Sequence, residues 1–246
     1  MKLAPTLPAG LLSALERFQA WTKIWPFRAP ALKIGLRPAG ILPALALVSC
    51  FSVAAQQNTP VEEEHAQLLT GKKRCLIAYA GKDHSFTLET PVHSAKPSDV
   101  PGFITIDKQI VQATVVPVDK GIDLHTLSAA REREVLLKYM EYELDYYRKK
   151  LKQHYSHLQT EWVTLQGKQF LVWYFDMPEN YKMVSRQVYI STLFFDQVMD
   201  LNAPVFKSKD SDWGRARGIL IRLAGTMKTF DKRLDLEELG RKLNKG

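Results

Sequence analysis

The sequence predicts an α+β fold: an antiparallel sheet of hairpins, covered by one long central helix and a C-terminal helix. Two observations predict it. Short segments rich in Val, Ile and Thr, several with alternating polar and apolar residues, occupy much of residues 74–118 and 162–205. Between them, from about Ser128 to His157, the chain has no Gly or Pro and is rich in Glu, Lys, Arg and Leu. Hairpins with segregated helices are typical of α+β layering.

The first half of the predicted domain contains strands and one long loop. Residues from Gln56 to about Thr70 are polar, and we interpret them as a tether or a short helix. A loop is expected from Pro91 to Pro101, and a hairpin around Asp107-Lys108. The predicted strands are Cys75–Ala80, His84–Thr90, Phe103–Ile106 and Ile110–Val118.

The central helix is predicted from about Ser128 to His157, because apolar residues recur there at steps of three and four. One stripe of this kind covers a sheet or pairs with another helix, and covering its own sheet is the simpler interpretation. The stripe consists of Leu137, Met140, Leu144, Tyr147, Leu151, Tyr155 and Leu158.

After the helix, Trp162–Leu165 and Gln169–Asp176 are predicted to form a hairpin at Gln166-Gly167. Met183–Phe195 is predicted as a strand with Gln187, Tyr189, Ser191 and Leu193 on one face and Val184, Arg186, Val188, Ile190 and Thr192 on the other. A further strand follows at Gln197–Val205. Two further helices are predicted near the C-terminus. The first runs from Asp212 to about Phe230 with Ser211 as its N-cap, and the second is Leu236–Leu243.

Four features in this layout point to a known group: the central helix that leads to Trp162, the hairpin Leu165-Gln-Gly167-Lys-Gln-Phe-Leu171, the alternating pair Arg186–Asp200, and the closing helix that ends Met227-Lys-Thr-Phe230. From about Arg74 to Phe230 the layout resembles the Mog1/PsbP-like group, which includes DcrB-like envelope lipoproteins. The resemblance implies α/β/α layering. Because members of the group bind diverse partners, it implies no particular function.

A basic segment followed by the apolar run Ile41–Ala55 is typical of a secretory signal peptide. Cleavage after Val53-Ala54-Ala55 would release a chain that begins at Gln56. Alternatively, Leu47-Val-Ser-Cys50 resembles a lipobox, in which Cys50 is acylated and becomes the first residue. A retained membrane helix is a third interpretation, although 15 apolar residues fall short of the ~20 that span a bilayer.

We therefore divide the chain into a signal peptide (1–55), a polar tether (56–73) and one α+β domain (74–246). The segment before the apolar run is long for a leader, and a translation start near Leu32 would give one of ordinary length. An organellar transit peptide is the rival interpretation, but residues 1–48 contain only one serine. The expected location is the periplasm or the medium, or a membrane surface if Cys50 is lipidated.

The basic character of the chain belongs largely to this leader. Residues 1–55 hold six of the 34 Lys and Arg residues and one of the 26 Asp and Glu residues, so the remaining 191 residues have a net charge of +3. The charge therefore gives no argument for nucleic-acid binding. With Cys75 as the one remaining cysteine, a disulfide framework is excluded, and its apolar neighbours indicate a buried strand position.

Two groups of residues suggest chemistry. His154, His157 and Glu161 would share one face of a continuing helix, and such donors can ligate zinc; a solvated helix end is the plainer interpretation. Asp83-His84-Ser85 contains the residue types of a hydrolase triad, but neighbours in a strand point to opposite faces. Nucleophile-elbow, zinc-protease and phosphate-loop motifs are absent from the sequence.

Basic and aromatic residues suggest binding surfaces. Trp213 suits an interface anchor or a core position. The basic residues could meet lipid phosphates or an acidic polymer, although a solvated face is the simpler interpretation; they are Lys72, Lys73, Arg74, Arg215, Arg217 and Arg222. The aromatic residues could line a pocket, but core packing and cross-strand pairing are favoured; they are Trp173, Tyr174, Phe175, Tyr189, Phe194 and Phe195.

These observations predict an exported, non-catalytic binding or accessory module of the bacterial envelope, without a cofactor. Its partner would be another envelope protein, or a small apolar ligand held between the long helix and the sheet. The alternatives are a metal-dependent or hydrolytic enzyme that uses the His154/His157 region, and a tethering lipoprotein anchored at Cys50.

Overall fold

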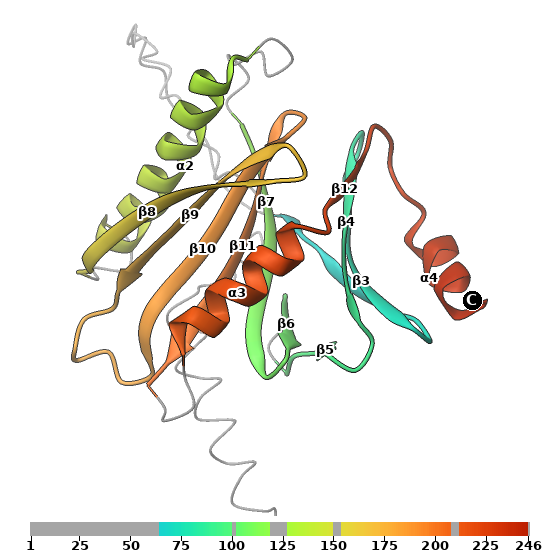
Figure 1. Cartoon of the computed structure of the whole chain (residues 1–246), viewed down its shortest axis with the longest axis horizontal. Helices are drawn as coiled ribbons and strands as arrows, with labels where there is room; N and C mark the ends of the chain where they lie inside the picture. The colour runs from blue at the N-terminus through green and yellow to red at the C-terminus, as the bar shows by residue number, and fades with distance from the viewer. Residues whose placement is uncertain (1–63, 100–101, 119–126, 150–153, 208–211, 246) are drawn as a thin grey trace, which may run out of the picture. The chain divides into compact units, whose positions relative to one another are not determined.

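The computed structural model of the chain describes residues 64–99, 102–118, 127–149, 154–207 and 212–245. In this part of the chain, two antiparallel sheets and three helices form an α+β structure (Figure 1). The predicted α+β class is therefore confirmed. The sequence did not predict that the strands would divide between two sheets.

The larger sheet has eight strands among the described residues, and its main path runs β5-β6-β7-β11-β10-β9-β8, with β1 paired to β7. β10 and β11 lie at its centre, because β10 also pairs with β9 and β11 also pairs with β7. The strands are β1 (Glu64–His65), β5 (Ala95–Pro97), β6 (Phe103–Ile106), β7 (Gln109–Pro117), β8 (Ser156–Leu165), β9 (Lys168–Asp176), β10 (Val184–Phe194) and β11 (Gln197–Phe206).

Two-residue turns set the register of the hairpins. Asp107 and Lys108 have φ values of 48° and 68°, and Gln166 and Gly167 have values of 50° and 78°. Positive φ at both central residues is the geometry that matches the right-handed twist of paired strands. The hairpins predicted around Asp107-Lys108 and Gln166-Gly167 are confirmed.

The smaller sheet has the strand order β12-β4-β3-β2, and helix α4 packs against β2 and β3. Cys75 in β3 is completely buried, as its apolar neighbours predicted. The elements are β2 (Gln67–Thr70), β3 (Arg74–Ala80), β4 (Ser85–Pro91), β12 (Lys228–Phe230) and α4 (Leu236–Lys245).

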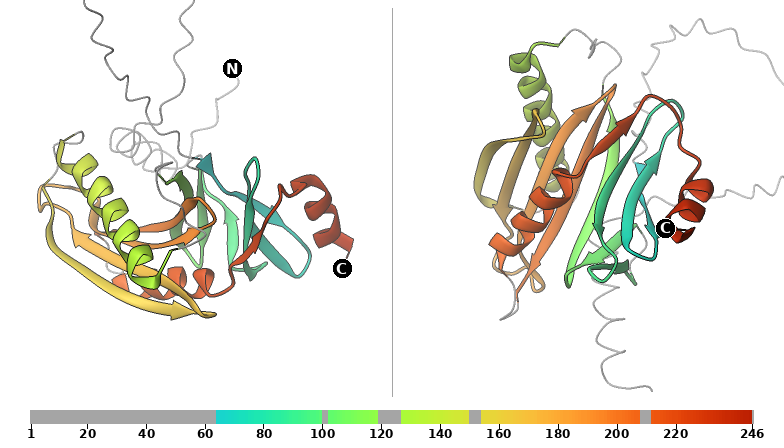
Figure 2. Two further views of the ribbon diagram at one scale, coloured as in Figure 1. Left: turned by 90° about the horizontal axis from the view of Figure 1, so that it is seen from above. Right: turned by 45° about the vertical axis from the view of Figure 1, so that its right-hand side comes forward.

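Helices α2 (Ala129–Lys149) and α3 (Trp213–Ala224) lie on opposite faces of the large sheet (Figure 2). α2 packs against β9 and β10, whereas α3 packs against β10, β11 and β4. α3 therefore contacts both sheets, and its buried face belongs to the main hydrophobic core. Side chains from both sheets and from α3 share this core, among them Ile77, Phe86, Leu88, Val188, Ile190, Leu201, Ile219, Leu220 and Leu223.

The central helix is shorter than predicted, and its buried face matches the predicted stripe only in part, at Met140, Leu144 and Tyr147. α2 ends at Lys149, and β8 begins at Ser156, where it pairs with Asp176 in β9. Long-range pairing thus overrides a local pattern that contains no helix breaker. Leu137 and Leu158 of the predicted stripe are exposed, while the buried residues of α2 are Val135, Leu136, Tyr139, Met140, Glu143, Leu144 and Tyr147.

Two other boundaries also require correction. Residues 64–70, predicted as part of a tether or short helix, form β1 and β2. The helix predicted from Asp212 to Phe230 ends at Ala224, with Gly225 as its C-cap. The Thr226 hydroxyl donates to the Leu223 carbonyl and accepts from the Glu89 amide at 2.8 Å, which ties the helix end to β4. Ser211, the predicted N-cap, lies outside the described residues, and Asp212 is the observed cap.

Adjacent leucines on α2 test this corrected helix face. Leu136 is 1% exposed and Leu137 is 37% exposed. We expect Leu136→Ala to lower the free energy of unfolding by about 2–5 kcal/mol, because a buried side chain is lost and a cavity remains. Leu137→Ala is the matched control, with an expected change within about 0.5 kcal/mol. Urea denaturation measures both, and equal losses would contradict the helix orientation described above.

Candidate functional site

The face of the large sheet toward α2 carries a row of polar and aromatic side chains from neighbouring strands. Tyr189 in β10 lies opposite Trp173 of β9 on one side and Asn202 of β11 on the other. Asn202 in turn lies opposite Gln112 of β7. Directly paired residues of an antiparallel sheet project to the same side, so these four side chains share one face. We call this face, with the Ser191–Asp200–Thr114 row beside it, the polar face.

Hydrogen bonds connect most of the polar face to α2. The Tyr147 hydroxyl of α2 lies 2.8 Å from the Tyr189 hydroxyl, and Tyr189 stacks on Trp173 with ring centroids 3.8 Å apart. Trp173 Nε1 donates to Ser191 Oγ at 3.1 Å, and Ser191 Oγ donates to Asp200 Oδ1 at 2.5 Å. All five residues are almost completely buried. The network therefore fixes the position of α2 on the sheet.

Burial also sets the protonation of the two phenols. It raises the pKa of Tyr147 well above its ordinary value, and the nearby Glu143 carboxylate adds to the increase while the hydrogen bond from Tyr189 opposes it. Burial likewise raises the pKa of Tyr189, with further increases from Tyr147, Glu143 and Asp200. Both hydroxyls therefore stay protonated at neutral pH and act as hydrogen-bonding groups.

Three amide atoms of this face have no hydrogen-bond partner among the described residues: Gln112 Nε2, Asn202 Oδ1 and Gln187 Oε1. Gln112 and Asn202 bond to each other at 3.1 Å through their other amide atoms. Their exposed fractions are 0% and 2%, so these atoms do not face bulk solvent. An unsatisfied buried polar atom costs about 1–3 kcal/mol, so this arrangement opposes folding.

The sequence contains a signal for this face. Gln112 and Thr114, Tyr189 and Ser191, and Asp200 and Asn202 each stand two residues apart in a strand. This alternation predicts one polar side to each strand, and such a side is ordinarily the solvated one. The pairing of the strands brings the polar sides of β7, β10 and β11 together on one face, and these side chains are buried there. Neither fact can be predicted from the alternation within one strand.

The three residues considered for a metal site do not share a helix face. His154 precedes β8 and is exposed, while His157 and Glu161 lie within β8. His157 Nδ1 lies 3.0 Å from Asp176 Oδ2, and Glu161 pairs with Arg217 of α3 at 2.6 Å. In the described part of the chain, His, Cys, Asp and Glu side chains form no group of three or more that could hold a metal ion.

Trp213 is 38% exposed at the first turn of α3 and covers a charged network on the other face of the sheet. The Arg186 guanidinium lies 5.3 Å from the Trp213 ring centroid and 5.0 Å from that of Tyr174. Arg186 Nε donates to Asp176 Oδ1 at 2.6 Å. These contacts join α3 to β9 and β10, so Trp213 has a packing role at the surface.

The remaining candidate residues have mostly structural partners. Arg74 pairs with Glu89 and Arg222 with Asp107, whereas Lys72, Lys73 and Arg215 are exposed. The Ser85 hydroxyl, part of Asp83-His84-Ser85, bonds to the backbone of residues 232 and 234. Of the six aromatic residues named above, Trp173, Phe175, Tyr189 and Phe194 are each at most 1% exposed, whereas Tyr174 and Phe195 are half-buried. Cys50 lies outside the described residues.

Comparison with known proteins adds a likeness in fold. The chain matches no protein-family model and no curated protein. It is similar to the solution structure of cyanobacterial PsbP (CyanoP) from Synechocystis sp. PCC 6803, with 11% identity and a TM-score of 0.41 over 63% of this chain and 92% of that one. PsbP also names the group that the sequence resembles. The likeness concerns the fold alone and transfers no residue role, partner or activity.

Asp176 gives the surface network a predictable pH dependence. Burial favours the neutral acid, but the hydrogen bonds and charges of Arg186 and His157 outweigh it, so the pKa of Asp176 falls below its ordinary value of 3.8. A carboxylate with a lowered pKa stabilises the folded state at pH values above its ordinary pKa, and this contribution is lost as the pH falls further.

We expect Asp176→Asn to lower the free energy of unfolding by about 0.5–1 kcal/mol at pH 7, since Asp176 remains partly exposed. The difference from the wild type should shrink below pH 3.8. Asp231→Asn, at an exposed position, is the control and should change little at either pH. Urea denaturation at both pH values measures the effect. A difference that stays constant with pH would show that the ion pair is not responsible.

Proposed function

We propose that this protein is a non-catalytic binding domain that recognises a protein partner through the polar face. The observation that carries the proposal is the pair Gln112 and Asn202, each of which has one buried amide atom with no hydrogen-bond partner in the described part of the chain. A folded protein gains nothing from such an arrangement by itself, because apolar side chains of similar size would remove the cost. A partner that supplies the missing donor and acceptor makes the arrangement favourable in the complex.

The position of α2 supports recognition at this place. α2 packs against β9 and β10, whereas Gln112 and Asn202 lie on β7 and β11, farther along the same face. Both amides are buried in the free chain, so a partner segment would have to displace the side chains that cover them and take their place beside α2. The chemistry of the face also suits binding: amides do not titrate, and Tyr147 and Tyr189 keep their protons at neutral pH. A small ligand between α2 and the sheet is the other outcome that the test below distinguishes.

Replacing both amides together separates binding from folding. We expect the double variant Gln112→Leu/Asn202→Leu to be at least as stable as the wild type, because it removes both unsatisfied groups and leaves no broken bond. The same variant should lose the partner that co-purifies with tagged wild-type protein from its native cells. Quantitative mass spectrometry of the purified complexes and urea denaturation measure the two effects.

Gln109→Leu is the matched control, on the same strand as Gln112. Gln109 Nε2 donates to the Pro204 carbonyl at 2.7 Å, so its loss should reduce stability by about 1 kcal/mol while the partner is retained. If the double variant recovers the same proteins as the wild type, the polar face is not the binding surface. Recovery of a small molecule in place of a protein would assign the face to a ligand.

We further propose that the domain acts outside the cytoplasm, in the bacterial envelope. The support is the leader, in which an apolar run follows basic residues and ends in small ones. In the described part of the chain, no helix has the length and apolar character needed to cross a bilayer. Within the leader, Cys50 is the candidate for lipid attachment to a membrane.

The intact mass of the mature protein tests the export proposal. With the native leader, we expect a chain that begins at Gln56 and fractionates with the periplasm or the medium. A chain that begins at an acylated Cys50, in the membrane fraction, would make the protein a lipoprotein and direct the search to membrane-bound partners. Full-length protein in the cytoplasm would contradict export. Cys50→Ser is the control, because it changes the result only if lipidation occurs.

A further inference from the structure

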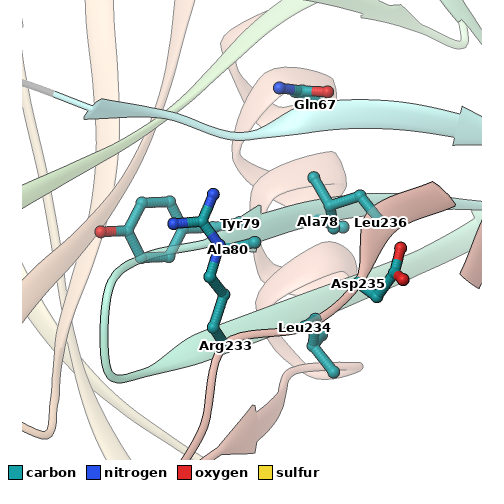
Figure 3. A pocket seen from close by; sticks show the side chains of 8 residues that line it. All are labelled: Gln67, Ala78, Tyr79, Ala80, Arg233, Leu234, Asp235 and Leu236. Carbon is teal, nitrogen blue, oxygen red and sulfur yellow. The ribbon is translucent and has the colours of Figure 1, made fainter. Parts of the chain in front are cut away.

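The outer face of the small sheet contains a hollow with a preformed wall. Alternate residues of β3 enter the core, among them Ile77 and Tyr79, which leaves Leu76, Ala78 and Ala80 on the side toward α4. The small alanine side chains leave space above the strand. The resulting cavity has a volume of about 720 Å³ and is lined by Gln67, Ala78, Tyr79, Ala80, Arg233, Leu234, Asp235 and Leu236 (Figure 3). Cavities of this size hold small organic molecules.

The segment that forms the opposite wall is fixed at both ends. The Ser85 hydroxyl donates to the Lys232 carbonyl at 2.8 Å and accepts from the Leu234 amide at 2.9 Å. The backbone on each side of Arg233 is therefore held against β4. Beyond it, Asp235 Oδ1 accepts from the Glu238 amide at 2.9 Å and caps α4. The wall does not have to form when a ligand arrives.

Arg233 is the charged group of this cavity that remains available. It makes no hydrogen bond or ion pair with the described residues. The nearby acidic side chains are engaged elsewhere: Glu237 pairs with Arg241 at 2.8 Å, Glu238 pairs with Lys242 at 2.7 Å, and Asp235 caps the helix. Figure 3 shows the Arg233 guanidinium and the Asp235 carboxylate on separate parts of the wall.

We propose that this cavity is a second binding site, for a small organic anion with a short apolar body. Its carboxylate would accept a two-pronged hydrogen bond from the Arg233 guanidinium, which matches the geometry of that group. Its hydrocarbon part would lie on Ala78, Ala80, Leu234 and Leu236. The site lies on the small sheet and includes no residue of the polar face. A test of this site is therefore independent of a test of the function proposed above.

Three probes of simple chemistry test the proposal. Octanoate has both the carboxylate and the apolar body, octylamine reverses the charge, and acetate lacks the chain. We expect octanoate alone to cause saturable NMR shifts at the backbone amides of residues 78–80 and 233–236, with a Kd of about 0.1–1 mM. Equal binding of octylamine would exclude recognition by Arg233, and equal binding of acetate would exclude the apolar wall. Absence of saturable shifts with octanoate in the millimolar range would overturn the proposal.

Variants of the wall complete the test. Arg233→Gln should weaken octanoate binding about tenfold or more, since the charged donor is lost. Arg241→Gln is the matched control, because Arg241 is already paired with Glu237. This variant should bind octanoate with the affinity of the wild type. Ala80→Leu keeps the charge but fills the hollow, and it should also abolish binding. Retention of wild-type affinity by Arg233→Gln or by Ala80→Leu in folded protein would overturn the site.

Discussion

The pairing of β10 with β11 is the constraint on which the rest of the structure depends. The two strands pair from Val184 opposite Phe206 to Phe194 opposite Gln197, and each is flanked by another strand. Because side chains alternate along a strand, this one register determines both faces of the large sheet. A slip of β10 by one residue would move Ile190 out of the hydrophobic core and bring Ser191 into it.

The two faces of the large sheet differ in their contribution to stability. Toward α3, the centre of the sheet is apolar and continuous with the small sheet, and each buried Leu, Ile or Phe side chain contributes about 1.5–3 kcal/mol. Toward α2, the sheet buries Asp200, Asn202 and Gln112, which costs free energy wherever a polar atom lacks a partner. The apolar face therefore stabilises the domain enough to maintain a polar face that folding alone does not need.

The sequence predicted local features well and long-range ones poorly, for a physical reason. Alternation and turn residues depend on neighbours in the chain, so most strands and the Gln166-Gly167 turn were predicted correctly. The end of α2 was wrong because the pairing of Ser156 with Asp176 is not encoded nearby. The polar face could not be predicted for the same reason: it exists only where four strands, β7, β9, β10 and β11, meet α2. The Arg233 cavity likewise depends on Ser85. Its hydroxyl accepts a hydrogen bond from the amide of Leu234, which lies 149 residues later in the chain.

The two candidate sites have one property in common: in each, a polar group is held in position before a partner or ligand binds. At the polar face, the Gln112–Asn202 bond orients two amides and leaves one atom of each unsatisfied. In the cavity, Ser85 holds the backbone around Arg233 and the neighbouring acids are already paired. Preorganised groups lose little entropy on binding, so a few correctly placed atoms give useful affinity. Because the two sites lie on different sheets and share no residue, a substitution at one should leave binding at the other unchanged.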